Sequence, residues 1–111
     1  RVVGDVEGRV CILVDDMIDT GGTITKAADA IMEAGAKDVV IAATHPILSG
    51  PAAQRLEACR AREVIVTNTL PIEPEHEFEG LTVLSIAPLI ASAVREVFLD
   101  GSVTSLFGER A

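Results

Sequence analysis

The residues best suited to bind a ligand lie together between Asp15 and Thr23, where the sequence reads DDMIDTGGT. Adjacent glycines let a backbone turn tightly and aim several N–H groups at one point, and a following helix adds the positive end of its dipole. The hydroxyls of Thr20 and Thr23 supply further donors. With Gly21 and Gly22, these threonines predict a phosphate-binding loop that needs no lysine.

The three aspartates of this segment, Asp15, Asp16 and Asp19, predict a second chemistry beside the phosphate. Carboxylates repel a bare phosphate, so we expect them to face sugar hydroxyls, which donate to them, or Mg²⁺, which prefers oxygen ligands. A phosphate at one end and a polyol or metal ion at the other describes a sugar phosphate. The structural alternative is an acidic turn followed by a helix that Thr23 caps. The whole motif, in its context, favours binding over this alternative.

Alternating apolar segments predict the elements that hold the loop. Apolar runs indicate strands at 10–14, 39–43, 64–67 and 81–86, and helical spacing indicates helices at 24–34, 51–59 and 88–97. This alternation predicts an α/β fold: a three-layer sandwich with a mostly parallel sheet and helices on both faces. The loop then lies at the carboxyl end of the first strand, where such sheets bind ligands. The apolar stripe of the last helix is expected in the core; it consists of Leu89, Ile90, Ala93, Val94 and Val97.

Length, composition and charge exclude several classes of protein. The chain has 111 residues, which predicts one domain, and its net charge is −8. A nucleic-acid platform would show a basic stripe, and no apolar run reaches the length of a membrane span. Cys11 and Cys59 lie far apart, so we expect reduced thiols, small hydrophobic roles for both and a cytoplasmic protein. The chain opens with Arg1, so we expect it to be part of a longer protein.

The segment from Cys11 to Thr23, CILVDDMIDTGGT, resembles the phosphoribosyl-diphosphate fingerprint of type I phosphoribosyltransferases and ribose-phosphate diphosphokinases. Other segments resemble the C-terminal half of the diphosphokinases, also called PRPP synthetases: GDVEGR at 4–9, THPILSGPA at 44–52, VTNTLP at 66–71 and SVTSLF at 102–107. The resemblance covers essentially all 111 residues, and it implies a type I phosphoribosyltransferase-like fold.

The resemblance implies an activity and roles for particular residues. Enzymes of this family transfer the β,γ-diphosphoryl group of ATP, with Mg²⁺, to the C1 hydroxyl of ribose 5-phosphate. Residues 19–23 would hold the 5-phosphate, and Asp15 and Asp16 would hold the ribose hydroxyls directly or through Mg²⁺. A homohexamer regulated by phosphate and ADP is also implied. Its allosteric phosphate site would include Ser102, Val103 and Thr104.

The same resemblance assigns the remaining machinery to a part of the enzyme outside these residues. The family's N-terminal half carries most adenine contacts, a metal-binding histidine and aspartate, and a catalytic lysine and arginine. We therefore expect residues 1–111 to be the phosphoribosyl-binding half of a two-domain enzyme, with no catalytic residue of its own and inactive when alone. Two alternatives stay open: a phosphoribosyltransferase that uses the same loop, and a non-catalytic regulatory paralogue.

Two histidines are weighed as candidate ligands. His45 ends the second predicted strand, and a hydrogen bond within its own loop is favoured over contact with a ligand. His76 lies among four glutamates in a segment that contains Pro74, which indicates a solvated loop rather than a metal site.

Overall fold

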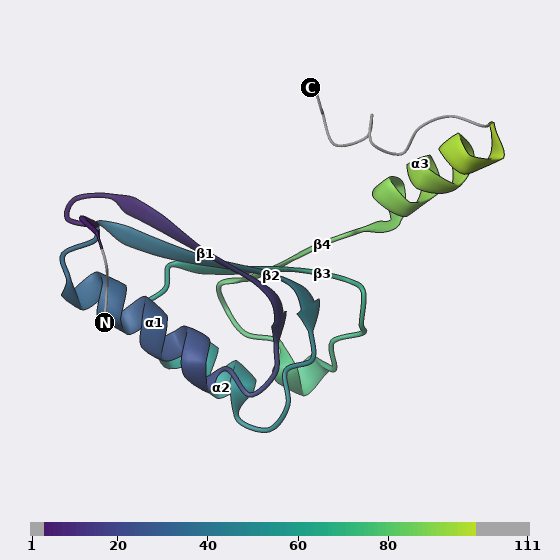
Figure 1. Cartoon of the computed structure of the whole chain (residues 1–111). Helices are drawn as coiled ribbons and strands as arrows, with labels where there is room; N and C mark the ends of the chain where they lie inside the picture. Colours follow the sequence, from purple (N-terminus) through teal and green to yellow (C-terminus); the bar gives the residue numbers. More distant parts are fainter. Residues whose placement is uncertain (1–3, 100–111) are drawn as a thin grey trace.

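The computed structural model describes residues 4–99 as a parallel sheet with its connecting helices (Figure 1). The four strands are β1 (Val10–Ile18), β2 (Asp38–Pro46), β3 (Glu63–Thr67) and β4 (Leu81–Leu84), and they pair in parallel in the order β1-β2-β3-β4. The helices are α1 (Gly22–Glu33), α2 (Ala52–Ala58) and α3 (Ala87–Phe98), with a single 3₁₀ turn, η1 (Pro74–His76). The predicted α/β class and parallel sheet are confirmed.

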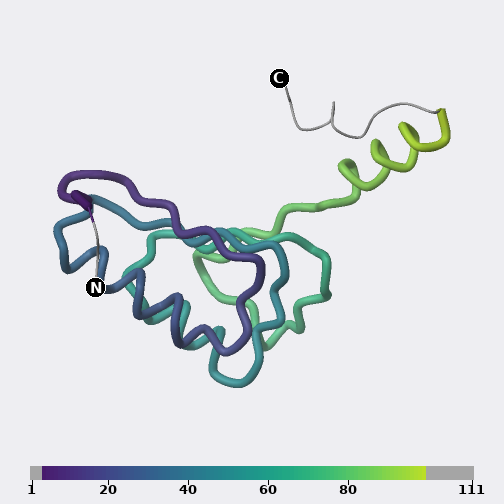
Figure 2. The backbone as a smooth tube through the Cα atoms, in the orientation of Figure 1, coloured from purple at the N-terminus to yellow at the C-terminus, as the bar shows by residue number. Residues whose placement is uncertain are grey.

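The strand order explains where the helices lie. Each strand is added on the same side of the preceding one, and parallel crossovers are right-handed. The connections therefore all fall on one face of the sheet, where Figures 1 and 2 show α1, α2 and η1 together. The described residues thus form two layers, and the second helical layer of the predicted sandwich is not supplied by residues 4–99.

The core lies between the sheet and helices α1 and α2. Val39 and Ile41 of β2 and Val66 of β3 are fully enclosed, and they pack in one cluster with residues of α1 and α2. The opposite face of the sheet carries the alternate residues of β1, and there Ile12 is 64% exposed. The sheet is therefore apolar on both faces, although helices of the described chain cover only one.

β1 is longer than its apolar run predicts. The ladder with β2 continues through the pairs of Asp15 with Ala43 and of Ile18 with Pro46. Asp15 and Asp16 consequently belong to the strand, while the predicted loop had begun at Asp15. Aspartate and proline are depleted in strands, so the sequence pattern stops before the hydrogen-bonded ladder does.

The apolar stripe of α3 is not part of the core, which corrects the expectation from sequence. The four larger side chains of the stripe are exposed, from 39% at Leu89 to 69% at Val97, and Ala93 is half-buried. The helix is joined to β4 by a short segment in which Ile86 N–H donates to Asn68 Oδ1 at 2.8 Å, and α3 then extends away from the sheet (Figure 2). The stripe therefore has no described element to pack against. None of the described helices is long and apolar enough to cross a membrane.

A matched pair of substitutions tests which sheet face is the core of this chain. We expect Ile41→Ala to lower the free energy of unfolding of the 111-residue chain by about 2–5 kcal/mol, because it leaves a cavity. Ile12→Ala removes the same atoms from the uncovered face and is expected to cost about 1 kcal/mol or less. Urea denaturation followed by circular dichroism measures both values. Equal losses would contradict the one-sided core.

Candidate functional site

A hollow of about 160 Å³ lies at the carboxyl end of β1, where the strand passes into α1. Its walls are formed by Asp15 and by every residue from Met17 to Ile24. The structure thus brings together Asp15 and the whole predicted phosphate loop, residues 19–23. Asp16 follows Asp15 in β1 and donates its N–H to Asp15 Oδ1 at 2.8 Å, but it does not line the hollow.

The backbone carbonyls at the start of this loop are bonded to the segment between β2 and α2. Leu48 N–H donates to Ile18 O at 3.0 Å, and Ser49 N–H donates to Asp19 O at 2.9 Å. Leu48 is buried and has a φ of +53°, a left-handed conformation that is strained for a branched side chain. Neither donor lines the hollow, so both carbonyls are directed away from it.

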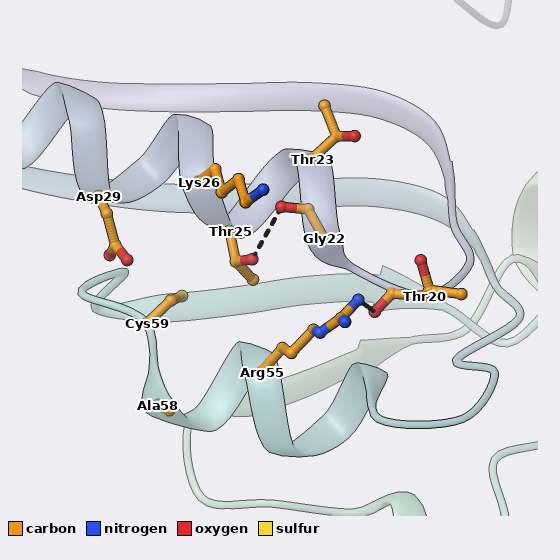
Figure 3. A pocket seen from close by; sticks show the side chains of 9 residues that line it. All are labelled: Thr20, Gly22, Thr23, Thr25, Lys26, Asp29, Arg55, Ala58 and Cys59. Carbon is orange, nitrogen blue, oxygen red and sulfur yellow. Dashed lines mark hydrogen bonds between the residues drawn. The ribbon is translucent and has the colours of Figure 1, made fainter.

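The next three carbonyls are bonded in the same sense. Arg55 Nη1, from α2, donates to Thr20 O at 3.1 Å. The hydroxyl of the buried Thr25 is shared between the following two, because its Oγ1 lies 2.6 Å from Gly21 O and 3.2 Å from Gly22 O. Figure 3 shows the second of these contacts. Five successive carbonyl oxygens, from residue 18 to residue 22, therefore have donors that stand outside the hollow.

Unlike these carbonyl groups, the amide N–H groups at the start of α1 lack hydrogen-bond partners within the helix. The first four N–H groups of a helix have no partner within the helix, and no side chain of residues 4–99 caps α1. Gly21 is the N-cap residue with a φ of +79°, a conformation that favours glycine. Thr23 lies inside the first turn, so the alternative in which it caps the helix is not observed. Free N–H groups at the positive end of the helix dipole suit an anion.

A second, larger hollow of about 460 Å³ lies between α1 and α2, on the other side of the loop (Figure 3). Lys26 and Arg55 line it, together with Asp29 and Cys59. Burial raises the pKa of the Cys59 thiol, whose Sγ donates to Leu56 O at 3.2 Å. Its side chain packs against the core cluster, in agreement with the small hydrophobic role expected of it.

The remaining candidate residues lie away from the hollow after β1 or outside residues 4–99. His45 Nδ1 lies 2.9 Å from the hydroxyl oxygen of Thr69, in the segment that follows β3, so the predicted bond within its own loop is wrong. His76 lies in η1, and no group of three histidine, cysteine or acidic residues among residues 4–99 is arranged to hold a metal ion. The predicted allosteric residues, 102–104, fall outside the described residues.

The main participant that the sequence did not indicate is Arg55. It lies 35 residues beyond Thr20 and outside every motif considered above. A lone arginine on a short helix carries no signal of a contact with a distant backbone carbonyl. Only the packing of α2 beside α1 brings it to the loop.

Comparison with known proteins supports a family assignment. Residues 1–108 match the family model of the phosphoribosyl synthetase-associated domain. The chain is 65% identical over 110 residues to a ribose-phosphate pyrophosphokinase of Streptomyces coelicolor, and 67% identical over 107 residues to one of Mycobacterium tuberculosis. These alignments cover 99% and 96% of this chain but only 34% and 33% of the two relatives. The chain thus spans about a third of the length of the curated relatives that it matches.

A solved structure leads to the same assignment. The crystal structure of phosphoribosylpyrophosphate synthetase from Mycobacterium smegmatis superposes with a TM-score of 0.86 at 66% identity, over 91% of this chain and 34% of that one. Both the sequence match and the shared fold extend over nearly the whole chain. The chain therefore belongs to the phosphoribosyl synthetase-associated domain family and corresponds to the C-terminal region of ribose-phosphate pyrophosphokinases.

Proposed function

We propose that this chain is the phosphoribosyl-binding part of a ribose-phosphate pyrophosphokinase. The complete enzyme would transfer the diphosphoryl group of ATP to the C1 hydroxyl of ribose 5-phosphate and release AMP and 5-phosphoribosyl 1-diphosphate. The observation that carries the proposal is the hollow after β1, which is lined by Asp15 and by the first residues of α1, a helix with no side-chain cap among the described residues. The high identity to such enzymes supports the same reading.

The 5-phosphate of the sugar is proposed to bind at residues 19–23, through the backbone amides of this segment. These donors are neutral, so they offset the phosphate charge through their dipoles and the end of α1. Asp15, on the same hollow, would accept hydrogen bonds from the ribose 2- and 3-hydroxyls, and Asp16 is assigned the same role by family resemblance. Fixing both ends of the sugar orients C1 and its hydroxyl toward the nucleotide, which lowers the entropic part of the barrier.

Mg²⁺ is the metal ion that the family implies, and the carboxylates present have the right chemistry for it. Asp15 and Asp16 offer the hard oxygen ligands that this ion prefers. Residues 4–99 contain no cluster of three or more acidic or histidine ligands, so oxygens of the bound substrates would have to complete the coordination. The bound ion would supply neutralisation of the negative charge on the transferred diphosphoryl group.

The proposal extends to the longer enzyme of which this chain would be a part. Residues 1–111 would form the sugar-phosphate half of a two-domain enzyme, and the part that binds ATP and carries the catalytic cations would lie in the other half. No residue of this chain is assigned as catalytic, and we expect the chain to be inactive alone. The cytoplasmic homohexamer and its regulation by phosphate and ADP, with Ser102, Val103 and Thr104 at the allosteric site, remain part of the proposal by family resemblance.

The decisive experiment assays the full-length protein that carries this chain. With ATP, Mg²⁺ and ribose 5-phosphate, we expect equimolar AMP and 5-phosphoribosyl 1-diphosphate. A parallel assay offers 5-phosphoribosyl 1-diphosphate with purine or pyrimidine bases. Nucleotide formation in the second assay alone would identify a phosphoribosyltransferase, and no turnover in either would indicate a non-catalytic paralogue.

The loop assignment predicts the effect of filling the space beside Gly22. A Cβ at this position would lie 3.1 Å from Arg55 Nη1, so the larger side chain of Gly22→Val must displace either the guanidinium or the loop. We expect KM for ribose 5-phosphate to rise at least about tenfold, which corresponds to about 1.4 kcal/mol of lost binding. KM for ATP should stay within about twofold. Ala58→Val on α2, outside the loop, is the control; an unchanged KM for ribose 5-phosphate in Gly22→Val would reject the assignment.

The sugar-hydroxyl assignment predicts the effect of Asp15→Asn. The substitution keeps the size of the side chain but removes the charge that strengthens hydrogen bonds from the ribose hydroxyls. We expect KM for ribose 5-phosphate to rise about tenfold in initial-rate assays of the full-length enzyme. Asp5→Asn makes the same chemical change in an exposed segment before the start of β1, whereas Asp15 lies near the end of that strand, and it should have no effect. If both variants behave alike, Asp15 does not hold the sugar.

A further inference from the structure

We propose that Arg55 is a positioning residue of the sugar-phosphate site: through Thr20 it holds the loop backbone in the conformation that binds the phosphate. The inference rests on the proposed function, because it assigns Arg55 a role in binding ribose 5-phosphate at the hollow after β1. Arg55 does not line that hollow, and it acts from the far side of the loop, out of α2.

The geometry around the guanidinium connects two parts of the chain. Arg55 Nη1 donates to Thr20 O at 3.1 Å, and the same atom lies 3.1 Å from the position of a Cβ on Gly22. Figure 3 shows the side chain extended from α2 toward the loop. The ion pairs of the described residues join Arg60 to Glu33 and Arg62 to Asp38. Arg55 therefore forms no ion pair with a carboxylate of the described residues, and its side chain donates to the loop carbonyl of Thr20 instead.

Because the peptide unit is planar, the bond from Arg55 to Thr20 O also fixes the direction of the Gly21 N–H group. In a trans peptide, the carbonyl of one residue and the N–H of the next point in opposite directions. Holding Thr20 O on the side of α2 therefore holds Gly21 N–H on the side of the hollow. The backbone donors of Leu48 and Ser49 act in the same way on the two preceding peptide units.

The unit between Thr20 and Gly21 is the one that most needs such a restraint. Gly21 has a φ of +79°, and glycine populates positive and negative φ about equally, so its peptide can rotate at little cost. A rotated unit would aim Thr20 O at the bound phosphate and remove one donor. Leu48 and Ser49 donate through their backbones, whereas the restraint on Thr20 O comes from a side chain that a substitution can remove.

The test compares Arg55→Ala and Arg55→Lys in the full-length enzyme, with Arg60→Ala as the control. Arg60→Ala removes the same charge next to the end of α2, but Arg60 bonds to α1 through Glu33 and Asp29 rather than to the loop. We expect Arg55→Ala to raise KM for ribose 5-phosphate about three- to tenfold, the range typical of one lost hydrogen bond. The kcat at saturating ribose 5-phosphate and KM for ATP should stay within about twofold.

The conservative variant separates positioning from a general loss of structure. Arg55→Lys keeps a donor on a flexible chain, so we expect a KM between those of the wild type and Arg55→Ala. A KM in Arg55→Ala equal to that in Arg60→Ala overturns the proposal. So does a parallel fall in kcat, ATP binding and melting temperature, which would mean a purely structural role.

Direct contact with the phosphate is the other alternative. It would raise KM for ribose 5-phosphate more than about a hundredfold in Arg55→Ala, with full restoration in Arg55→Lys, and this result also overturns the proposal. If the wild-type enzyme does not use ribose 5-phosphate at all, the proposed function fails and this inference fails with it.

Discussion

The parallel pairing of β1 with β2 is the constraint on which the site depends. It brings the carboxyl ends of both strands to one edge of the sheet, so that the segment following β2 lies behind the segment following β1. The N–H groups of Leu48 and Ser49 then donate hydrogen bonds to the carbonyls of Ile18 and Asp19. These carbonyls therefore point away from the hollow, and the groups that remain available to a ligand are the amides at the start of α1. A backbone that satisfies its acceptors on one side is left with donors on the other.

This arrangement resolves an apparent conflict between the charge of the chain and its proposed ligand. A protein with a net charge of −8 is a poor general partner for anions. The hollow after β1 needs no net positive charge, because amide dipoles and a helix end act at short range. The described cations nearest the loop, Lys26 and Arg55, line the neighbouring hollow rather than this one. The acidic residues of the chain and a phosphate site are therefore compatible within a few residues of each other.

Most of the fold, and the place of the candidate phosphate loop between β1 and α1, could be predicted from sequence, and the wrong predictions have physical causes. Local apolar runs are sufficient to locate strands and helices, but strand order depends on long-range pairing, and that order decides that α1 and α2 share one face. The predicted core position of the α3 stripe is wrong because periodicity indicates an apolar face and cannot indicate what covers it. The sequence does not indicate the contact of Arg55 for a similar reason: its partner is a backbone carbonyl, which every residue possesses.

The donors around the hollow after β1 also bear on how binding would respond to acidity. Amide N–H groups and threonine hydroxyls keep their protons throughout the physiological range, unlike histidine or a thiol. A phosphate monoester, by contrast, loses its second proton near pH 6. In a loop of this kind the ligand, and not the donors of the loop, would be the titrating species. The affinity of the loop for the sugar phosphate would then rise with pH as the phosphate acquires its second charge, and it would stay constant above that point. The charge distribution of the loop itself would not change.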